Sequence, residues 1–345
     1  MFARISKRRL GTAGAAAAAA GCFALMLVFP EGCKKGAAEG LNLCLSVLVP
    51  SLFPFMAAAG LAVKTGLCGS GGKKILRGTG ALAPLMLLAL IGGYPVGARA
   101  AAEMYRGGQL TPAQAKTAAC CLVCAGPGFL LGFVGSVYGS EEVGLIIYTA
   151  QAASVVLLTL GANILFKNNK TPDTAVRFTP LPFGTALVEA AHDAAVSMVS
   201  IGGLAVLFGA FGGILGTVIP NEELRRYLMS SLEVCTAVKL LSGCPIEFCA
   251  FAVGFGGICV HFQIFAALGE LKVNKLLFFF IRILQGVITA LLTHLGLRLF
   301  FRETAVFSTA AVEQSGFFGG SALSGAALLT VAVCFLLSLR NQQRR

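Results

Sequence analysis

Charged residues and tryptophan are scarce in this sequence. Only 12% of its 345 residues are Asp, Glu, Lys or Arg, whereas soluble domains contain roughly 25%. Hydrophobic residues make up 57%, and several apolar runs of about 20 residues are long enough to cross a bilayer as helices. This composition excludes an ordinary soluble protein and predicts an all-α polytopic membrane protein. Because there is no Trp, an aromatic belt gives little help in placing the ends of the spans.

Signatures of catalysis are also missing. The chain has no phosphate-binding G-x-x-x-x-G-K-[ST], no zinc-binding H-E-x-x-H and no G-x-S-x-G nucleophile elbow. We therefore expect neither an enzyme nor a bound cofactor. Twelve Cys are present, but ten lie in apolar segments or their flanks, which is typical of small packing residues and not of a disulfide framework. Only Cys33 and Cys68 fall in polar stretches.

The net charge of +12 would suggest a nucleic-acid partner in a soluble protein, but the positive-inside rule explains it here without one. Nineteen of the 27 Lys and Arg fall on one side if both termini and the segments 64–80, 99–116, 167–180 and 270–275 are cytoplasmic. Five lie on the opposite side, and Lys239, Arg282 and Arg298 lie within apolar or amphipathic segments. The apolar segments counted are 10–29, 41–63, 81–98, 117–138, 144–166, 195–219, 244–269, 276–301 and 323–339.

This charge bias depends on segment 81–98 not crossing the membrane. If it crossed, the basic loops on its two sides would face opposite ways. The string Ile91-Gly-Gly-Tyr-Pro-Val-Gly-Ala-Arg99 places three Gly and one Pro within seven residues, which releases backbone groups from helical pairing. The alternatives are a re-entrant segment and a proline kink in a spanning helix, and the loop charges favour the re-entrant segment. The N-terminal run has two interpretations as well, a signal peptide or an uncleaved first span, and its length favours the span.

Segment 221–243 is a second candidate re-entrant segment, in the second half of the chain. It is amphipathic and too polar for a lipid-facing transmembrane span, and it enters the membrane from the side opposite to segment 81–98. Two re-entrant elements from opposite faces are typical of an inverted repeat, so we expect about eight spanning helices plus two re-entrant segments. The expected organisation is an N-terminal segment with the first span and an external loop (1–40), a first half (41–166), a cytoplasmic linker (167–180), a second half (181–301), and an external loop, last span and basic tail (302–345).

Polar side chains inside apolar segments are the candidate binding residues, because an intramembrane charge costs at least about 2.5 kcal/mol. The candidates of the second half are Ser231, Glu233, Thr236 and Lys239, with His261 and Gln263 after a glycine-rich stretch. Interfacial positions for Glu233 and Lys239, and a hydrogen-bonded packing role for His261, are the alternatives. The candidates of the first half are the unwound-backbone residues Gly93, Tyr94, Pro95, Gly97 and Arg99. We expect Gly93–Arg99 and Ser231–Lys239 to line one cavity, because both need polar partners that lipid cannot supply.

Several motifs resemble a known family. Val49-Pro-Ser-Leu-Phe-Pro-Phe55, Gly92-Gly-Tyr-Pro-Val-Gly-Ala-Arg99, Leu232-Glu-Val-Cys-Thr236 and Phe255-Gly-Gly-Ile-Cys-Val-His-Phe-Gln263 are similar to the sporulation integral membrane proteins of the YlbJ type, which belong with the nucleoside-recognition, or Gate, domains. The resemblance covers about residues 41–300. It implies a multi-pass fold related to concentrative nucleoside transporters and to the membrane gate of ferrous iron permeases, and a role in spore formation.

Three functions from different classes follow. The first is a cell-membrane permease with both termini cytoplasmic, which moves a small polar, nucleoside-like solute, with or without a coupling cation. The second is a transition-metal ion gate that uses the thiols of Cys120, Cys121 and Cys124, since thiolates select such metals; close packing is the alternative for this cluster. The third is a non-transporting scaffold of the spore envelope. Association of identical copies remains open.

Overall fold

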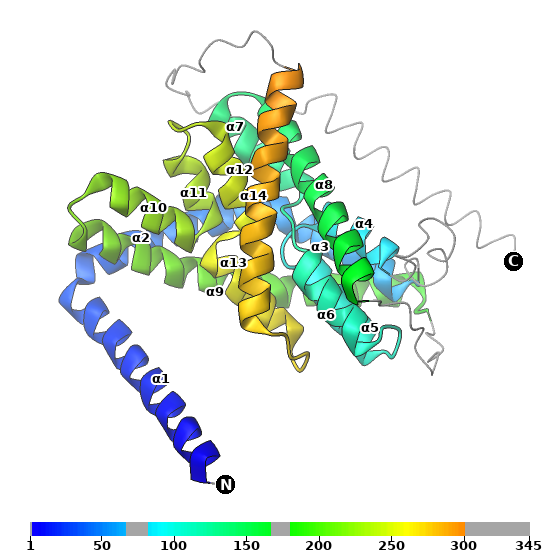
Figure 1. Ribbon diagram of the computed structural model, residues 1–345, viewed down its shortest axis with the longest axis horizontal. Coiled ribbons are helices and arrows are strands. Elements are labelled where there is room, and N and C mark those ends of the chain that lie inside the picture. The colour runs from blue at the N-terminus through cyan, green and yellow to red at the C-terminus, as the bar shows by residue number, and fades with distance from the viewer. Residues whose placement is uncertain (1, 67–81, 167–179, 301–345) are drawn as a thin grey trace, which may run out of the picture.

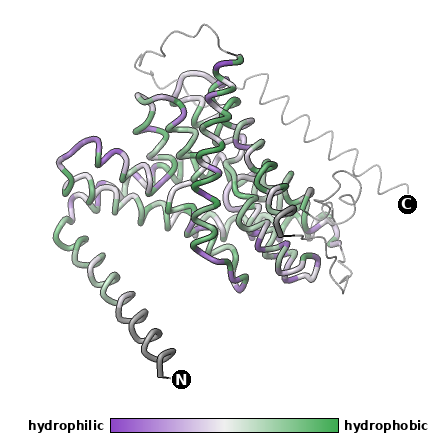
Figure 2. The backbone as a smooth tube through the Cα atoms, in the orientation of Figure 1, coloured by the Kyte–Doolittle hydropathy of each residue, from purple (hydrophilic) through white to green (hydrophobic). Residues whose placement is uncertain are grey.

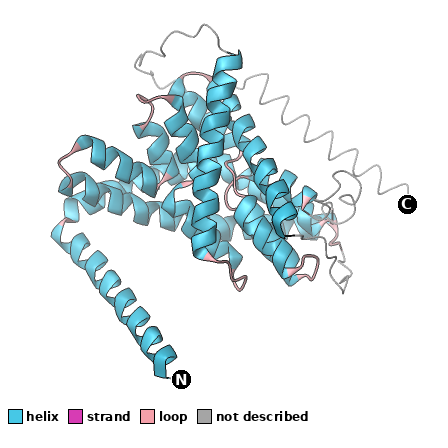
Figure 3. Cartoon of the chain, viewed as in Figure 1, coloured by secondary structure: helices cyan, strands magenta, loops and turns pink. Residues whose placement is uncertain are grey.

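The computed structural model describes residues 2–66, 82–166 and 180–300, and every regular element in these ranges is a helix (Figure 3). The segments 64–80 and 167–180, which are predicted to be cytoplasmic, and the segment 302–345 lie largely or wholly outside the described residues. The elements, with η for π-helical turns, are α1 (Phe2–Val28), α2 (Pro30–Leu43), η1 (Cys44–Leu48), α3 (Val49–Lys64), α4 (Ala83–Gly92), α5 (Val96–Arg106), α6 (Pro112–Cys121), η2 (Gly128–Val134), α7 (Gly135–Tyr138), α8 (Glu141–Phe166), α9 (Phe183–Val218), α10 (Glu222–Leu232), α11 (Val234–Leu240), α12 (Ile246–Phe255), α13 (Gly257–Leu268) and α14 (Lys275–Phe300).

The two halves of the chain present these helices in the same order. Each half begins with a long helix, continues with two interrupted helical segments and ends with a 26-residue helix. In the first half these are α2–η1–α3, the pairs α4/α5 and α6/η2–α7, and α8. In the second half they are α9, the pairs α10/α11 and α12/α13, and α14. An inverted repeat of the kind that the sequence predicts would produce such a repeated order, and the inversion itself stays a prediction.

Among the described residues, five helical segments are long and apolar enough to cross a membrane. They are Pro30–Lys64, Glu141–Ala162, Phe183–Val218, Ile246–Leu268 and Lys275–Leu299. The first begins at Pro30, inside the stretch expected to be an external loop, so Cys33 lies in a helix and not in a loop. Segment 117–138, expected as one apolar span, is interrupted after Cys121 and resumes at Gly128. The physical reason is local, because Pro127 has no backbone N–H to donate and disfavours helical backbone at Gly126 before it, so a new helical segment begins after it.

The connections gather at two ends of the bundle. Figure 1 shows the α5–α6 and α13–α14 connections at the lower end, and the α7–α8 and α11–α12 connections at the upper end. The hydropathy colouring in Figure 2 includes hydrophilic stretches at several of these connections and along α10, and is mostly hydrophobic along the long helices between them. This distribution is the one expected if an apolar layer surrounds the middle of the bundle. Helix α1 projects away from the bundle (Figure 1).

The long helices α2 and α9 pack through small residues. Gly32, Gly36 and Gly40 of α2 lie against Gly213 and the neighbouring small residues of α9. A Cβ added at Gly32 would lie 2.9 Å from the carbonyl oxygen of Gly213, closer than real contacts allow. Such small-residue stripes let helices approach closely in lipid, where van der Waals contact drives association. The GxxxG spacing at Gly209 and Gly213 predicts this contact face.

Candidate functional site

Four helix interruptions meet in the middle of the molecule. Two of them, at Gly93 and at 122–127, belong to the first half, and a Cβ added at Gly93 would lie only 2.8 Å from the backbone nitrogen of Gly126. The other two, at Glu233 and Gly256, belong to the second half, and Gly257 lies against the backbone of Leu232–Val234 in the same way, at 3.2 Å. Glycine is required at Gly93 and Gly256 because their φ angles are 73° and 88°.

Two buried glutamines tie the interruptions of one half to those of the other. Gln151 and Gln285 each lie ten residues after the first residue of the last helix of their half. The amide nitrogen of Gln151 donates to the carbonyl of Val253 at 3.2 Å, near the end of α12. The amide nitrogen of Gln285 donates to the carbonyl of Val123 at 2.8 Å, just after α6. The two contacts are reciprocal, so each half satisfies backbone that the other half leaves unpaired.

Arg282 stands at the centre of this arrangement and is fully buried. Its guanidinium donates to the carbonyls of Val123 at 2.9 Å and Phe255 at 3.2 Å, and also to the carbonyl of Gly254 and the side-chain oxygen of Gln285. Within the described ranges it makes no ion pair with a carboxylate. Backbone carbonyls at helix ends therefore provide its stabilising acceptors.

Tyr94, one of the predicted binding residues, belongs to the same hydrogen-bond network as Gln151. Its hydroxyl donates to the carbonyl of Val253, and the amide nitrogen of Gln151 lies 3.4 Å from it. Pro95 is the N-cap of α5, and Gly97 packs so closely on the carbonyl of Leu122 that a side chain there would overlap it. The sequence prediction that 91–99 is unwound is confirmed for 93–95, since α4 ends at Gly92 and α5 begins at Val96.

His261 and Gln263 are buried in α13. The Nε2 atom of His261 lies 2.9 Å from the carbonyl oxygen of Phe255, while its Nδ1 atom has no hydrogen-bond partner among the described residues. The imidazole is enclosed by aromatic rings, with Phe279 at 4.9 Å between centroids. The amide nitrogen of Gln263 lies 3.4 Å from the sulfur of Cys259 on the preceding turn. The contact of His261 with Phe255 is of the kind that the packing alternative for this residue predicts, and a ligand role for His261 and Gln263 stays a prediction.

The acidic and basic candidates of the second half do not pair with each other. Glu233 is the N-cap of α11, and its carboxylate accepts hydrogen bonds from the backbone nitrogens of Cys235 at 2.9 Å and Thr236 at 2.7 Å. Lys239 is exposed and its ammonium lies 5.9 Å from the centre of the Phe133 ring. The Ser231 hydroxyl donates to the carbonyl of Leu228. The carboxylate of Glu233 thus caps the amino-terminal end of α11, a role that the sequence did not predict.

We expect Glu233→Asn to retain the stability of the protein and Glu233→Ala to lose about 0.5–2 kcal/mol, because Asn caps a helix and Ala does not. Thermal unfolding of the purified variants measures this difference. Equal unfolding temperatures for the two variants would contradict the capping role of Glu233.

Arg99 lies elsewhere, at the mouth of a cleft. The cleft lies between α3, α4, α5 and α9. Its walls are apolar, from residues such as Met56, Val63 and Leu88, and its charged lining residues are Lys64, Arg99, Glu103 and Asp193.

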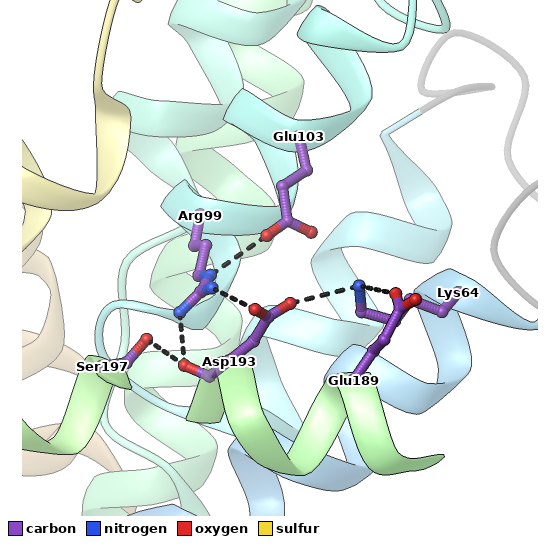
Figure 4. A network of polar contacts seen from close by, with 6 residues as sticks. All are labelled: Lys64, Arg99, Glu103, Glu189, Asp193 and Ser197. Carbon is purple, nitrogen blue, oxygen red and sulfur yellow. Dashed lines mark hydrogen bonds and ion pairs between the residues drawn. The ribbon is translucent and has the colours of Figure 1, made fainter. Parts of the chain in front are cut away.

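The charged groups at this cleft form one ion-pair cluster, shown in Figure 4. The ammonium of Lys64 in α3 lies 3.0 Å from Glu189 and 3.1 Å from Asp193, both in α9. The guanidinium of Arg99 in α5 lies 3.0 Å from Glu103 and donates at 2.9 Å to the carbonyl of Asp193. Asp193 thus connects α5 to α3, and the cluster ties three helices together across the cleft.

Gly93–Arg99 and Ser231–Lys239, the two segments expected to share a cavity, both approach a third segment, at Gly256 and Gly257. The ring of Tyr94 lies near Gly256, where an added Cβ would be 3.6 Å away, and the next residue, Gly257, contacts Glu233. The cleft itself is lined by Val96 and Arg99 but by no residue of 231–239. The shared cavity therefore stays a prediction.

The cysteine cluster lies beside the same interruptions. Cys120, Cys121 and Cys124 are buried, and the sulfurs of Cys121 and Cys124 contact the carbonyl oxygens of Leu158 and Ala89. In the part of the chain that the structure describes, no three His, Cys, Asp or Glu side chains converge as a metal site would require. These contacts are consistent with packing.

Sequence reasoning missed the residues at the centre, Gln151, Arg282 and Gln285, and the acidic partners at the cleft. The signal for Arg282 was available, because an arginine eight residues into a 26-residue apolar helix meets the same criterion that selected Glu233. Nothing in the sequence indicates that Glu189 and Asp193 face Lys64 and Arg99, because these partners are about 90 to 130 residues apart along the chain.

Comparison with known proteins gives a distant relative. The chain is 22% identical to the sporulation integral membrane protein YlbJ of Bacillus subtilis (strain 168), over 77% of this chain and 78% of that protein. No protein-family model and no solved structure matches the chain. The likeness supports the family that the motifs suggest, whereas the relation to nucleoside-recognition domains rests on the motifs alone. An integral membrane relative and five apolar helices together support a multi-pass membrane protein.

Proposed function

We propose that this protein is a permease for a small polar solute and acts in sporulation, as the name of its relative says of that protein. The observation that carries the proposal is the meeting of interrupted helices from both halves around Gln151, Arg282 and Gln285. Interrupted helices at the interface of two repeated halves are the feature from which many transporters build their binding site.

The proposed topology has about eight spans, with α4/α5 and α10/α11 re-entrant from opposite faces and both termini in the cytoplasm. The five long apolar segments, the interrupted segment α6/η2–α7, the apolar part of α1 and the apolar run at 323–339 would be the spans. The contact between α4 and α5 supports the re-entrant arrangement, because helices that turn back on each other must pack together.

The cleft at Arg99 is the proposed route from the cytoplasmic side. Charged side chains and apolar walls both line it. The ion pairs of Asp193 with Lys64 and Arg99 hold α5 against α3 and α9. Since half-exposed ion pairs contribute only about 0–1 kcal/mol each, this closure can open at little cost in free energy.

The direct test is uptake by proteoliposomes that contain the purified full chain. Labelled uridine, adenosine, a mixture of amino acids and Fe(II) are the probes, and protein-free liposomes are the blank. We expect saturable uptake of an organic solute. Uptake of Fe(II) alone would favour the metal-ion gate instead, and no uptake of any probe would favour the scaffold.

A substitution in the cleft provides a matched control. Val63 lines the cleft and Val188 is 70% exposed on α9. We expect Val63→Phe to narrow the cleft and to lower the initial rate of uptake by roughly tenfold, which corresponds to about 1.4 kcal/mol in the barrier. Val188→Phe should leave the rate unchanged. Equal rates for the two variants would show that the solute does not pass this cleft.

A further inference from the structure

The acceptors around Arg282 are all neutral oxygens, and most belong to helix ends. Gly254 and Phe255 are the last two residues of α12, and Val123 is the second residue after α6. Their carbonyls and the amide oxygen of Gln285 all accept from this one guanidinium. Two interrupted helices, one from each half, therefore direct their carboxyl-terminal ends at the same buried cation.

Helix ends of this kind are binding places for cations. The carboxyl-terminal end of a helix carries about half a negative charge on its unpaired carbonyls. In transporters with interrupted helices, unwound carbonyls and such ends coordinate Na⁺ or another coupling cation. The oxygen groups that an alkali cation would use are present here, in a set contributed by both halves.

We propose that the guanidinium of Arg282 is a tethered cation that fills the coupling-cation position at the ends of α6 and α12, so that this position needs no Na⁺ or K⁺. Calling this position a coupling-cation position rests on the proposed transport function. That the guanidinium of Arg282 fills the position does not rest on that function, and it can be tested without any solute.

The geometry leaves no room for a second cation at these oxygens. Four N–H···O contacts already use the carbonyls of Val123, Gly254 and Phe255 and the Gln285 side chain. The imidazole of His261 also reaches the Phe255 carbonyl, at 2.9 Å. The side chain of Arg282 has no exposed surface, so an alkali cation would have to displace the guanidinium.

The parent protein gives the first test. Its unfolding temperature is measured in NaCl, KCl and choline chloride at equal ionic strength, over a range of concentrations. We expect the same unfolding temperature in the three salts at each concentration, because only a ligand of the native state raises stability. A saturable rise in Na⁺ or K⁺ relative to choline would overturn the proposal.

The Arg282→Ala variant gives the second test. We expect it to unfold at a lower temperature than the parent in choline chloride, and to regain part of the loss in millimolar guanidinium chloride, which supplies the missing group. Arg298→Ala is the matched control, because Arg298 is exposed on the same helix, and guanidinium should not stabilise it. If guanidinium fails to stabilise Arg282→Ala, or stabilises the control equally, the tethered-cation role is wrong.

A third variant covers the case in which Arg282→Ala does not fold. Arg282→Lys retains the charge, and we expect it to fold and to show no dependence on Na⁺ or K⁺. An Arg282→Lys protein that is stabilised by Na⁺ or K⁺ would overturn the proposal. These measurements use no solute, so absence of uptake in proteoliposomes would count against the permease and not against the tethered cation.

Discussion

Gln151→Leu is expected to lower the free energy of unfolding by about 1–3 kcal/mol for each buried group that it leaves without a partner. The side-chain oxygen of Gln151 accepts from the backbone nitrogen of Ala125 at 3.0 Å, in the non-helical stretch after α6. Its nitrogen donates to the carbonyl of Val253 and contacts the Tyr94 hydroxyl. Leucine fills a similar volume but can make none of these contacts. Thermal unfolding in detergent, compared with the parent, measures the loss.

Thr149→Val is the control for Gln151→Leu. Thr149 lies two residues earlier on α8, is exposed, and its hydroxyl donates only to the carbonyl of Ile146 on its own helix. We expect this variant to stay within about 0.5 kcal/mol of the parent. If Gln151→Leu is as stable as Thr149→Val, the cross-connection between the halves does not contribute to stability.

Gly213→Ala is expected to force α2 and α9 apart. A Cβ at Gly213 would overlap the carbonyl oxygen of Gly32 and would lie 2.9 Å from the Cα of Gly36. Both are backbone atoms, so no side chain can rotate away and the helices themselves must move. Overpacking of this kind costs typically about 1–3 kcal/mol. The measurement is the shift in unfolding temperature of the purified variant.

Gly203→Ala tests whether that cost comes from the contact. Gly203 lies on the same helix, ten residues before Gly213, and a Cβ there meets no atom within 4 Å. Because alanine is the better helix former, by about 1 kcal/mol, we expect this variant to be as stable as the parent or more so. Destabilisation of both variants to the same extent would show that helix α9 tolerates no substitution, and the close approach would not explain the result.

The local conformation of the interruptions was predictable from the chain alone. Three Gly and one Pro in residues 91–99 predict that a helix ends there, and the helix does end at Gly92. Glycine can adopt the positive φ at Gly93, and proline removes a backbone donor, so both effects act within a few residues. For segment 117–138 hydropathy alone predicted one span, and the break at 122–127 follows instead from Pro127, which that prediction left out.

Partners across the molecule were not predictable in this way. Glu233 was selected for its charge, but the structure uses its carboxylate to cap α11, which depends on an extended backbone at that one residue. Arg99 was selected with its neighbours, but it meets Asp193 of the other half. A sequence shows which polar groups need a partner in a membrane, and it does not show how far along the chain that partner lies.

Hydropathy and the positions of glycine and proline thus determined by themselves that this is an all-helical membrane protein with interrupted helices, because helix formation and lipid solvation act on short stretches. The tertiary structure alone decided that Gln151 and Gln285 satisfy the backbone of the opposite half and that Arg282 lies between two helix ends. The physical reason is that a freed carbonyl in a dry interior accepts from whichever donor the packing brings near. That donor is set by how the two halves dock, which no local pattern encodes.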